Sequence, residues 1–131
     1  MSEEKRIYVV VAATVQSTDL DNPGKLRHVV QPMGRQIAQA CHVVSKLRFR
    51  YPQEDISKDF QPATTIILQA RDGKELSHNA YQLLNNHLRP VVFYDENLEA
   101  YGRLRPNTAL AVFATPTEVV GILDYLPLWG S

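Results

Sequence analysis

The chain has few of the residues that would restrict its chemistry most sharply. It contains a single cysteine, Cys41, which excludes an intramolecular disulfide and predicts a reducing compartment. Its four histidines are scattered, and no His/Cys spacing resembles a zinc site. Its six glycines are isolated, so the sequence has no glycine-rich phosphate loop. We therefore expect neither a metal nor a cofactor.

Long apolar runs are also missing. No stretch approaches the roughly 18 apolar residues of a membrane-spanning helix. The apolar run at 7–13 is too short for a secretory signal. The 131 residues, 44% apolar and 21% charged, are typical of one globular domain spanning 1–131. We predict a single cytoplasmic domain without membrane association.

Acidic residues are absent from the segment between Asn22 and Gln53, although the whole chain balances 14 basic against 14 acidic residues. The basic residues of this segment are Lys25, Arg27, Arg35, Lys46, Arg48 and Arg50. A loop-to-helix junction beginning near Gln31 lies in the same segment, which predicts a place where phosphate or another anion binds. The alternative is a solvated face balanced by the acidic residues at 54–59.

Apolar, β-branched runs predict four strands, at 7–13, 64–70, 91–94 and 109–114. A short further strand or hairpin arm is expected at 26–31. With three intervening or following helices, the order is β-α-β-α-β-β-α. This order predicts an α/β fold, a four-stranded mixed sheet flanked by helices.

The three helices are predicted from their apolar stripes and caps. The first follows Gly34, which permits close backbone approach, and its inner face is expected to be Ile37, Ala40, Cys41, Val44 and Leu47. Asp72 with Glu75 predicts a capping box for the second helix. Thr115 with Glu118 predicts another for the third, whose apolar stripe is Val119, Ile122, Leu123 and Leu126. Trp129 is expected to cap the core or form a dimer contact.

Candidate chemistry falls in the loops that leave the strand ends, 14–36 and 95–108. Arg35, in the first turn of the first helix, combines a guanidinium with free N–H groups and the helix dipole. In the second loop, one of three carboxylates, Asp95, Glu96 or Glu99, could act as a base or orient water. Arg103 and Arg105 could contact RNA phosphates. The alternatives are an exposed arginine without a role and a solvated connecting loop.

Three features together resemble the type 2 peptidyl-tRNA hydrolases. These are the helix start at 34–42, the β-α-β-α-β-β-α order and the ending at 104–116. The positions that match the family's motifs are Met33, Gly34, Ile37, Ala38, Cys41, Pro106, Thr108 and Pro116. The family's lysine before Ile-Ala is replaced by Gln36, with Arg35 one position earlier. Its loop aspartate aligns near Leu98, so Asp95 or Glu99 would have to substitute.

The resemblance implies hydrolysis, without a cofactor, of the ester between a peptide or N-blocked amino acid and the tRNA 3′ ribose. Arg35 would stabilise the oxyanion or position the 3′ end, Asp95 or Glu99 would orient water, and Thr108 would donate a hydrogen bond. The residues expected to bind RNA are Lys25, Arg27, Lys46, Arg48, Arg103 and Arg105. The residues expected to line the cleft are Gly34, Gln36, His42 and Asn107. The family commonly forms homodimers, which we expect here.

Two other interpretations remain open at this point. The missing lysine, together with Gly102 and Leu110 at two positions where the family has threonine, favours a non-catalytic RNA- or protein-binding module on the same fold. A third possibility is an enzyme for a small anionic substrate, with the 16–32 insertion as a lid. Salt dependence separates the tRNA-directed functions from the last one, because binding to tRNA phosphates weakens steeply with salt.

Overall fold

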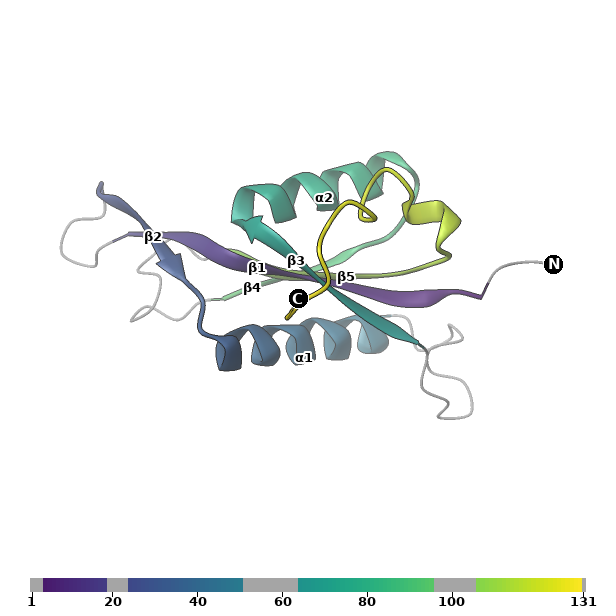
Figure 1. Cartoon of the computed structure of the whole chain (residues 1–131), viewed down its shortest axis with the longest axis horizontal. Helices are drawn as coiled ribbons and strands as arrows, with labels where there is room; N and C mark the ends of the chain where they lie inside the picture. The colour runs from purple at the N-terminus through teal and green to yellow at the C-terminus, as the bar shows by residue number, and fades with distance from the viewer. Residues whose placement is uncertain (1–3, 19–23, 51–63, 96–105, 131) are drawn as a thin grey trace.

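A continuous apolar run at 7–13 forms most of the central strand β1 (Arg6–Thr18) of a five-stranded sheet. The computed structural model describes residues 4–18, 24–50, 64–95 and 106–130. β1 pairs in parallel with β3 (Thr65–Asp72) and antiparallel with β2 (Leu26–Val30) and β5 (Asn107–Ala114). β4 (Val91–Tyr94) pairs antiparallel with β5. The protein is thus a small α/β domain, as predicted (Figure 1).

One helix packs on each face of this sheet (Figure 1). Successive side chains of a strand point to opposite faces, so both sets of β1 residues need a cover. Ile7 and Val9 are buried with the residues of helix α1 (Met33–Arg50). Tyr8 and Val10 are buried with those of helix α2 (Gly73–Asn85). The continuous apolar run therefore reflects a strand covered on both sides.

β1 is longer than the predicted strand at 7–13, because its polar end pairs with β2. The register runs from Thr14 opposite Val30 to Thr18 opposite Leu26. The expected hairpin arm at 26–31 is confirmed, and it raises the strand number from the predicted four to five. Polar residues at 16–18 gave no apolar signal, because the pairing of the backbone, and not burial alone, holds them in the strand.

The buried face of α1 differs from the predicted one. Its buried residues are Gln36, Gln39, Ala40, Val43 and Leu47. Ile37 is 48% exposed and Cys41 is exposed, so the prediction of both as core residues was wrong. The helix is rotated because two glutamine side chains find hydrogen-bond partners inside, which removes the cost of burying them.

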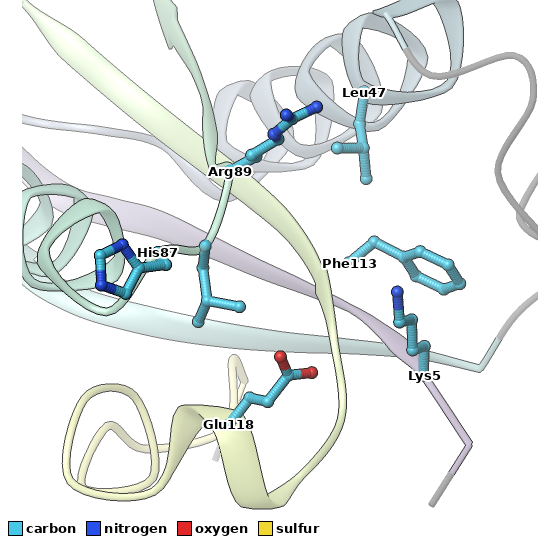
Figure 2. Close-up of a pocket in the computed structure, with 7 residues that line it drawn as sticks. Lys5, Leu47, His87, Arg89, Phe113 and Glu118 are labelled. Carbon is cyan, nitrogen blue, oxygen red and sulfur yellow. The ribbon is translucent and has the colours of Figure 1, made fainter. Parts of the chain in front are cut away.

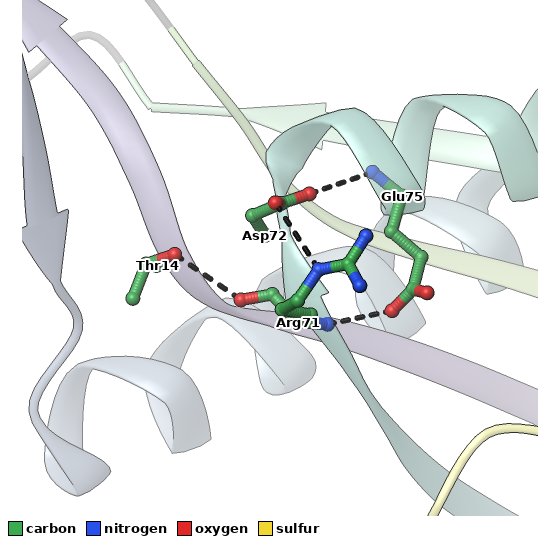
Figure 3. Close-up of polar contacts among 4 residues, drawn as sticks. All are labelled: Thr14, Arg71, Asp72 and Glu75. Carbon is green, nitrogen blue, oxygen red and sulfur yellow. Dashed lines mark hydrogen bonds and ion pairs between the residues drawn. The ribbon is translucent and has the colours of Figure 1, made fainter.

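The start of α2 is fixed by polar side chains (Figure 3). Asp72 is the N-cap, and its Oδ1 accepts a hydrogen bond of 2.9 Å from the Glu75 backbone N–H. The Glu75 carboxylate reaches back to the Arg71 N–H at 2.7 Å, one residue before the cap. Thr14 on β1 donates to the Arg71 carbonyl, which ties the cap to the central strand. The predicted cap of the second helix is confirmed.

The predicted third helix is replaced by a short 3-10 turn, η2 (Thr117–Val119), and further turns. The expected capping box does form: the Thr115 N–H donates to Glu118 Oε1, and the Glu118 N–H donates to Thr115 Oγ1. The helix ends early because Val120 is extended and Gly121 adopts a φ of 78°. The predicted apolar stripe is nevertheless buried throughout: Val119, Ile122, Leu123 and Leu126.

The chain then runs along the outer edge of β3. The Gln69 N–H donates to the Pro127 carbonyl, and the Trp129 N–H donates to the Ile67 carbonyl, both at 2.9 Å. Leu128 forms a bridge opposite Leu68. Trp129 packs against the core on the α1 side, so its predicted role as a cap of the core is confirmed. Neither helix in the described residues has the length and apolarity that a bilayer crossing needs.

Candidate functional site

The end of β4 and the start of β5 meet the first turns of both helices. The Asp95 N–H donates to the Pro106 carbonyl at 3.1 Å, which brings the two ends of the 95–106 connection together. Asn107 donates from Nδ2 to Ser77 Oγ on α2 at 3.3 Å. On the other face, Gln39 of α1 donates from Nε2 to Asp95 Oδ2 at 2.6 Å. The described ends of the predicted loop 95–108 therefore lie against both helices, whereas most of the predicted loop 14–36 belongs to β1, β2 and α1.

A stripe of polar and basic residues on α1 faces β4. Arg35, Gln39, His42 and Lys46 are spaced three or four residues apart, so they share one side of the helix. The His42 ring stacks on Phe93, with centroids 5.1 Å apart and planes 21° apart. We call this contact between residues 35–46 of α1 and 91–95 of β4 the α1–β4 seam.

Lys46 lies at the end of the seam that is nearest the C-terminus of α1. Its Nζ donates to the Val92 carbonyl at 2.8 Å and lies 5.8 Å from the centre of the Tyr94 ring. These contacts hold the ammonium against the edge strand of the sheet, where a carbonyl without a strand partner needs a donor. Lys46 remains exposed, so its charge still contributes to the surface.

The Asp95 carboxylate is held by an unusual partner. Gln39 is 3% exposed, and its Oε1 is buried without a hydrogen-bond partner among the described residues. The orientation of the amide is fixed, because the carboxylate can only accept and the NH₂ group must face it. Arg35, half-buried, lies one helical turn before Gln39, about 6 Å away between Cβ atoms. A carboxylate and a guanidinium therefore lie near one end of α1.

Gln36, at the position of the family's lysine, points into the protein. It donates from Nε2 to the Gln31 carbonyl at 2.8 Å, and its Oε1 accepts from Gln69 Nε2 and Trp129 Nε1, both at 2.9 Å. It also lines a small cavity of about 80 Å³ beside Ile37 and Cys41. Its amide thus joins α1, β3 and the C-terminal segment, because both the nitrogen and the oxygen form hydrogen bonds.

The other predicted site residues lie in different surroundings. Thr108 is fully buried, and its hydroxyl donates to the Phe93 carbonyl at 3.4 Å, between β4 and β5. An added Cβ at Gly34 would meet no atom within 4 Å, so nothing there requires a close backbone approach. Lys25 and Arg27 are exposed at β2. Arg48 is half-buried near the C-terminal end of α1, and at a rise of 1.5 Å per residue it lies about 20 Å from Arg35. Glu99, Arg103 and Arg105 lie outside the described residues.

Sequence reasoning missed the glutamines. Gln36, Gln39 and Gln69 were not expected to be inside, because glutamine is mostly exposed. The available signal was the alternative stripe Gln36, Ala40, Val43 and Leu47, which has helical spacing as good as that of the predicted face. Only a partner on another element distinguishes the two faces, and a single helix sequence does not contain that information.

Neither a metal-binding group in the described residues nor a match to a protein family or a curated protein indicates the chemistry of this site. Across the four described ranges, no group of three His, Cys, Asp or Glu side chains is arranged to hold a metal ion. No protein-family model matches the chain, and no curated protein matches it either. The arrangement that stands out chemically is therefore the fixed Asp95 carboxylate, with Arg35 one turn away on α1.

Proposed function

We propose that the protein is a tRNA-directed ester hydrolase resembling the type 2 peptidyl-tRNA hydrolases. It would release a peptide or an N-blocked amino acid from the 3′ ribose of tRNA. The observation that supports this most is the 2.6 Å hydrogen bond from Gln39 to Asp95. It fixes a loop carboxylate against the helix that carries Arg35, as the resemblance requires if Asp95 substitutes for the family's aspartate.

In this proposal the reaction uses water as the nucleophile. Asp95 accepts a hydrogen bond from the water and takes its proton as oxygen attacks the ester carbonyl carbon. The negative charge that develops on the carbonyl oxygen is stabilised by the Arg35 guanidinium and the N-terminus of α1. The tetrahedral intermediate then expels the ribose 3′ oxygen, which takes up the proton. Gln39 is a positioning residue, because it acts through Asp95.

The tRNA would bind along β2 and α1. From Lys25 to Arg50 the described chain has no acidic residue, and its exposed cations include Lys25, Arg27 and Lys46. These groups follow an extended surface that begins at the proposed catalytic end, which suits a backbone of regularly spaced phosphates. No base-specific contact is needed, because the common feature of all peptidyl-tRNAs is the ester at the 3′ end.

The test is release of the N-blocked amino acid from an N-acyl-aminoacyl-tRNA by the purified protein. Arg35→Ala should lower kcat by roughly 10²-fold or more, the usual loss when one oxyanion-stabilising group is removed. Lys74→Ala is the matched control, since Lys74 is an exposed cation on α2, on the other face of the sheet. Equal rates for Arg35→Ala and the wild type would contradict the assigned role.

A second candidate function is a non-catalytic tRNA-binding module. The observation that favours it is the buried, fully hydrogen-bonded Gln36 at the position where the family carries lysine. Such a protein would bind N-acyl-aminoacyl-tRNA at low salt and leave the ester intact. Binding without turnover by the wild type therefore selects this function over the hydrolase.

A further inference from the structure

A second site candidate lies beyond the Lys46 end of the α1–β4 seam, away from Arg35 and Asp95. A cavity of about 180 Å³ opens where β5 ends, at Phe113, and β1 begins, next to Lys5 (Figure 2). Phe113 lies six residue steps along β5 from Asn107, which is near the seam. At 3.3 Å per residue, the two residues are about 20 Å apart. The proposed hydrolase uses none of the residues around this cavity.

The cavity has an apolar wall and a charged rim. The half-buried Leu88 and Phe113 form the apolar wall, whereas Leu47 of α1 adjoins the cavity but is fully buried. Arg89 and His87 come from the loop after α2, and Glu118 comes from the turn after β5 (Figure 2). A ligand held here would place an apolar body against the wall and a charged group at the rim.

The cations at the rim have few partners. In the described part of the chain, the side chains of Arg89 and His87 make no hydrogen bond or ion pair, and Lys5 makes only a cation–π contact, 5.5 Å from the centre of the Phe113 ring. Glu118 already accepts a hydrogen bond from the Thr115 N–H. Of the charged residues that line the cavity, Lys5 and Arg89 are basic and Glu118 is acidic. The rim therefore has more basic than acidic side chains, which favours a ligand with an anionic group.

The backbone at His87 adds an independent observation. His87 adopts a φ of 62°, in the left-handed region that favours glycine. It closes α2, with the Leu88 N–H donating to the Leu83 carbonyl at 3.0 Å, as glycine does in many helix ends. A non-glycine residue in this conformation is strained, and such residues are found disproportionately at ligand sites. Here the strained position places an imidazole at the rim of the cavity.

We propose that this cavity binds a small monocarboxylate with a compact apolar body. The carboxylate meets Arg89 and Lys5, and the apolar body packs against Leu88 and Phe113. A volume of 180 Å³ corresponds to about six water molecules at ~30 Å³ each. It is below the roughly 300 Å³ at which pockets for drug-sized ligands begin, which favours a small ligand. A branched-chain or aryl acetic acid has the right size and charge.

The test uses three isosteric probes and isothermal titration calorimetry on the full chain. Phenylacetate supplies the carboxylate, phenylacetamide is its neutral counterpart, and phenethylamine carries the opposite charge. Phenylacetate should bind, and the other two should bind at least tenfold more weakly. Arg89→Gln should weaken phenylacetate binding by roughly tenfold or more, because it removes a charge-assisted hydrogen bond. Lys74→Gln, at the far end of α2, should bind phenylacetate as the wild type does.

Three results would overturn the proposal. Equal binding of phenylacetate and phenylacetamide would show that the rim does not select an anion. Preferential binding of phenethylamine, lost in Glu118→Gln, would show that Glu118 dominates the rim. Absence of binding by all three probes at millimolar concentration would mean that the cavity is not a site for ligands of this class. Arg89 and Glu118 are exposed, so their variants are expected to fold.

Discussion

Gln36 ties three parts of the chain together through one side-chain amide. Its partners lie on the loop before α1, on β3 and in the C-terminal segment, at 2.8–2.9 Å. Gln36 is only 7% exposed, so water cannot easily replace these partners. A buried amide with all its bonds made contributes modestly to stability, whereas its removal leaves the partners without hydrogen bonds. This asymmetry makes Gln36 a sensitive residue for mutation.

We expect Gln36→Leu to lower the free energy of unfolding by about 2 kcal/mol, because it leaves donors on Gln69 and Trp129 unpaired. Trp129→Phe, which removes the indole N–H and also makes the ring smaller, should cost about 1 kcal/mol for the hydrogen bond and more for the lost packing. Urea unfolding of the two single variants and the double variant measures the coupling. Because the two residues share a bond, the double variant should lose less than the sum of the single losses. Simple additivity would show that the hydrogen bond contributes nothing.

Replacing each of two glycines by alanine should change the stability of the protein in opposite directions. Gly34 lies in the first turn of α1 with open space where a Cβ would be, so Gly34→Ala should stabilise the protein by about 0.5 kcal/mol. Gly121 has a φ of 78°, and Gly121→Ala should destabilise it by about 1 kcal/mol. Thermal unfolding of both variants measures the difference. A loss of stability in Gly34→Ala would mean that Gly34 is needed for a close approach after all.

At the scale of elements, the cap of α2 links stability to pH. The pKa of Asp72 is lowered from its ordinary value of 3.8, chiefly by the hydrogen bond from the Glu75 backbone N–H. A lowered pKa in the folded state means that the ionised carboxylate stabilises the fold. This stabilisation is complete above the unfolded pKa and is lost as the pH falls below 3.8 through the folded value.

Asp72→Ala should therefore cost about 1 kcal/mol at neutral pH, the usual value for a lost N-cap. Asp72→Asn keeps a good cap that does not ionise, so it should retain most of the stability at pH 7. Urea unfolding between pH 7 and pH 3 separates the two effects. The stability advantage of wild type over Asp72→Asn should shrink as the pH falls below 4. An advantage that is constant with pH would contradict the assigned cause of the lowered pKa.

The elements show which sequence signals were sufficient. β1, β3, β4 and β5 were predictable because each is an apolar run buried on at least one face. α2 was predictable because its cap precedes leucines at helical spacing, of which Leu76 and Leu83 are buried and Leu84 is exposed. The apolar stripe at 119–126 correctly predicted which residues are buried, but the helix predicted there was wrong. Residues spaced three and four apart can all be buried by successive turns, and a single left-handed glycine at 121 prevents the regular helix.

The candidate site was predictable in outline and not in detail. Helix starts and strand ends do bring Arg35 and Asp95 to one end of α1, as expected of loops in this class of fold. The contribution of Gln39 depended on the rotation of α1 about its axis, which is decided by partners on β4 and β3. Tertiary hydrogen bonds of this kind override the apolar pattern of one helix, so no inspection of residues 33–50 alone would reveal them.

At the scale of the molecule, charge is segregated along the chain although the total is zero. The described residues of β2 and α1 hold the acid-free basic segment, so RNA binding should depend on salt through this side of the protein. The logarithm of the tRNA association constant should fall linearly with the logarithm of salt concentration. Lys25→Ala should reduce the magnitude of this slope by about 1, if Lys25 contacts one phosphate. An unchanged slope would place the tRNA elsewhere, and Lys74→Ala is again the control.

The measurement that tests the central proposal most directly is single-turnover hydrolysis of an N-acyl-aminoacyl-tRNA by the wild type and Asp95→Asn, with tRNA binding measured in parallel. The asparagine keeps the size of the side chain and its acceptor to Gln39 but cannot take a proton from water. We predict hydrolysis by the wild type, a loss of roughly 10²-fold or more in Asp95→Asn, and unchanged tRNA affinity. Hydrolysis at the same rate by both proteins, or none by the wild type, would contradict the proposal.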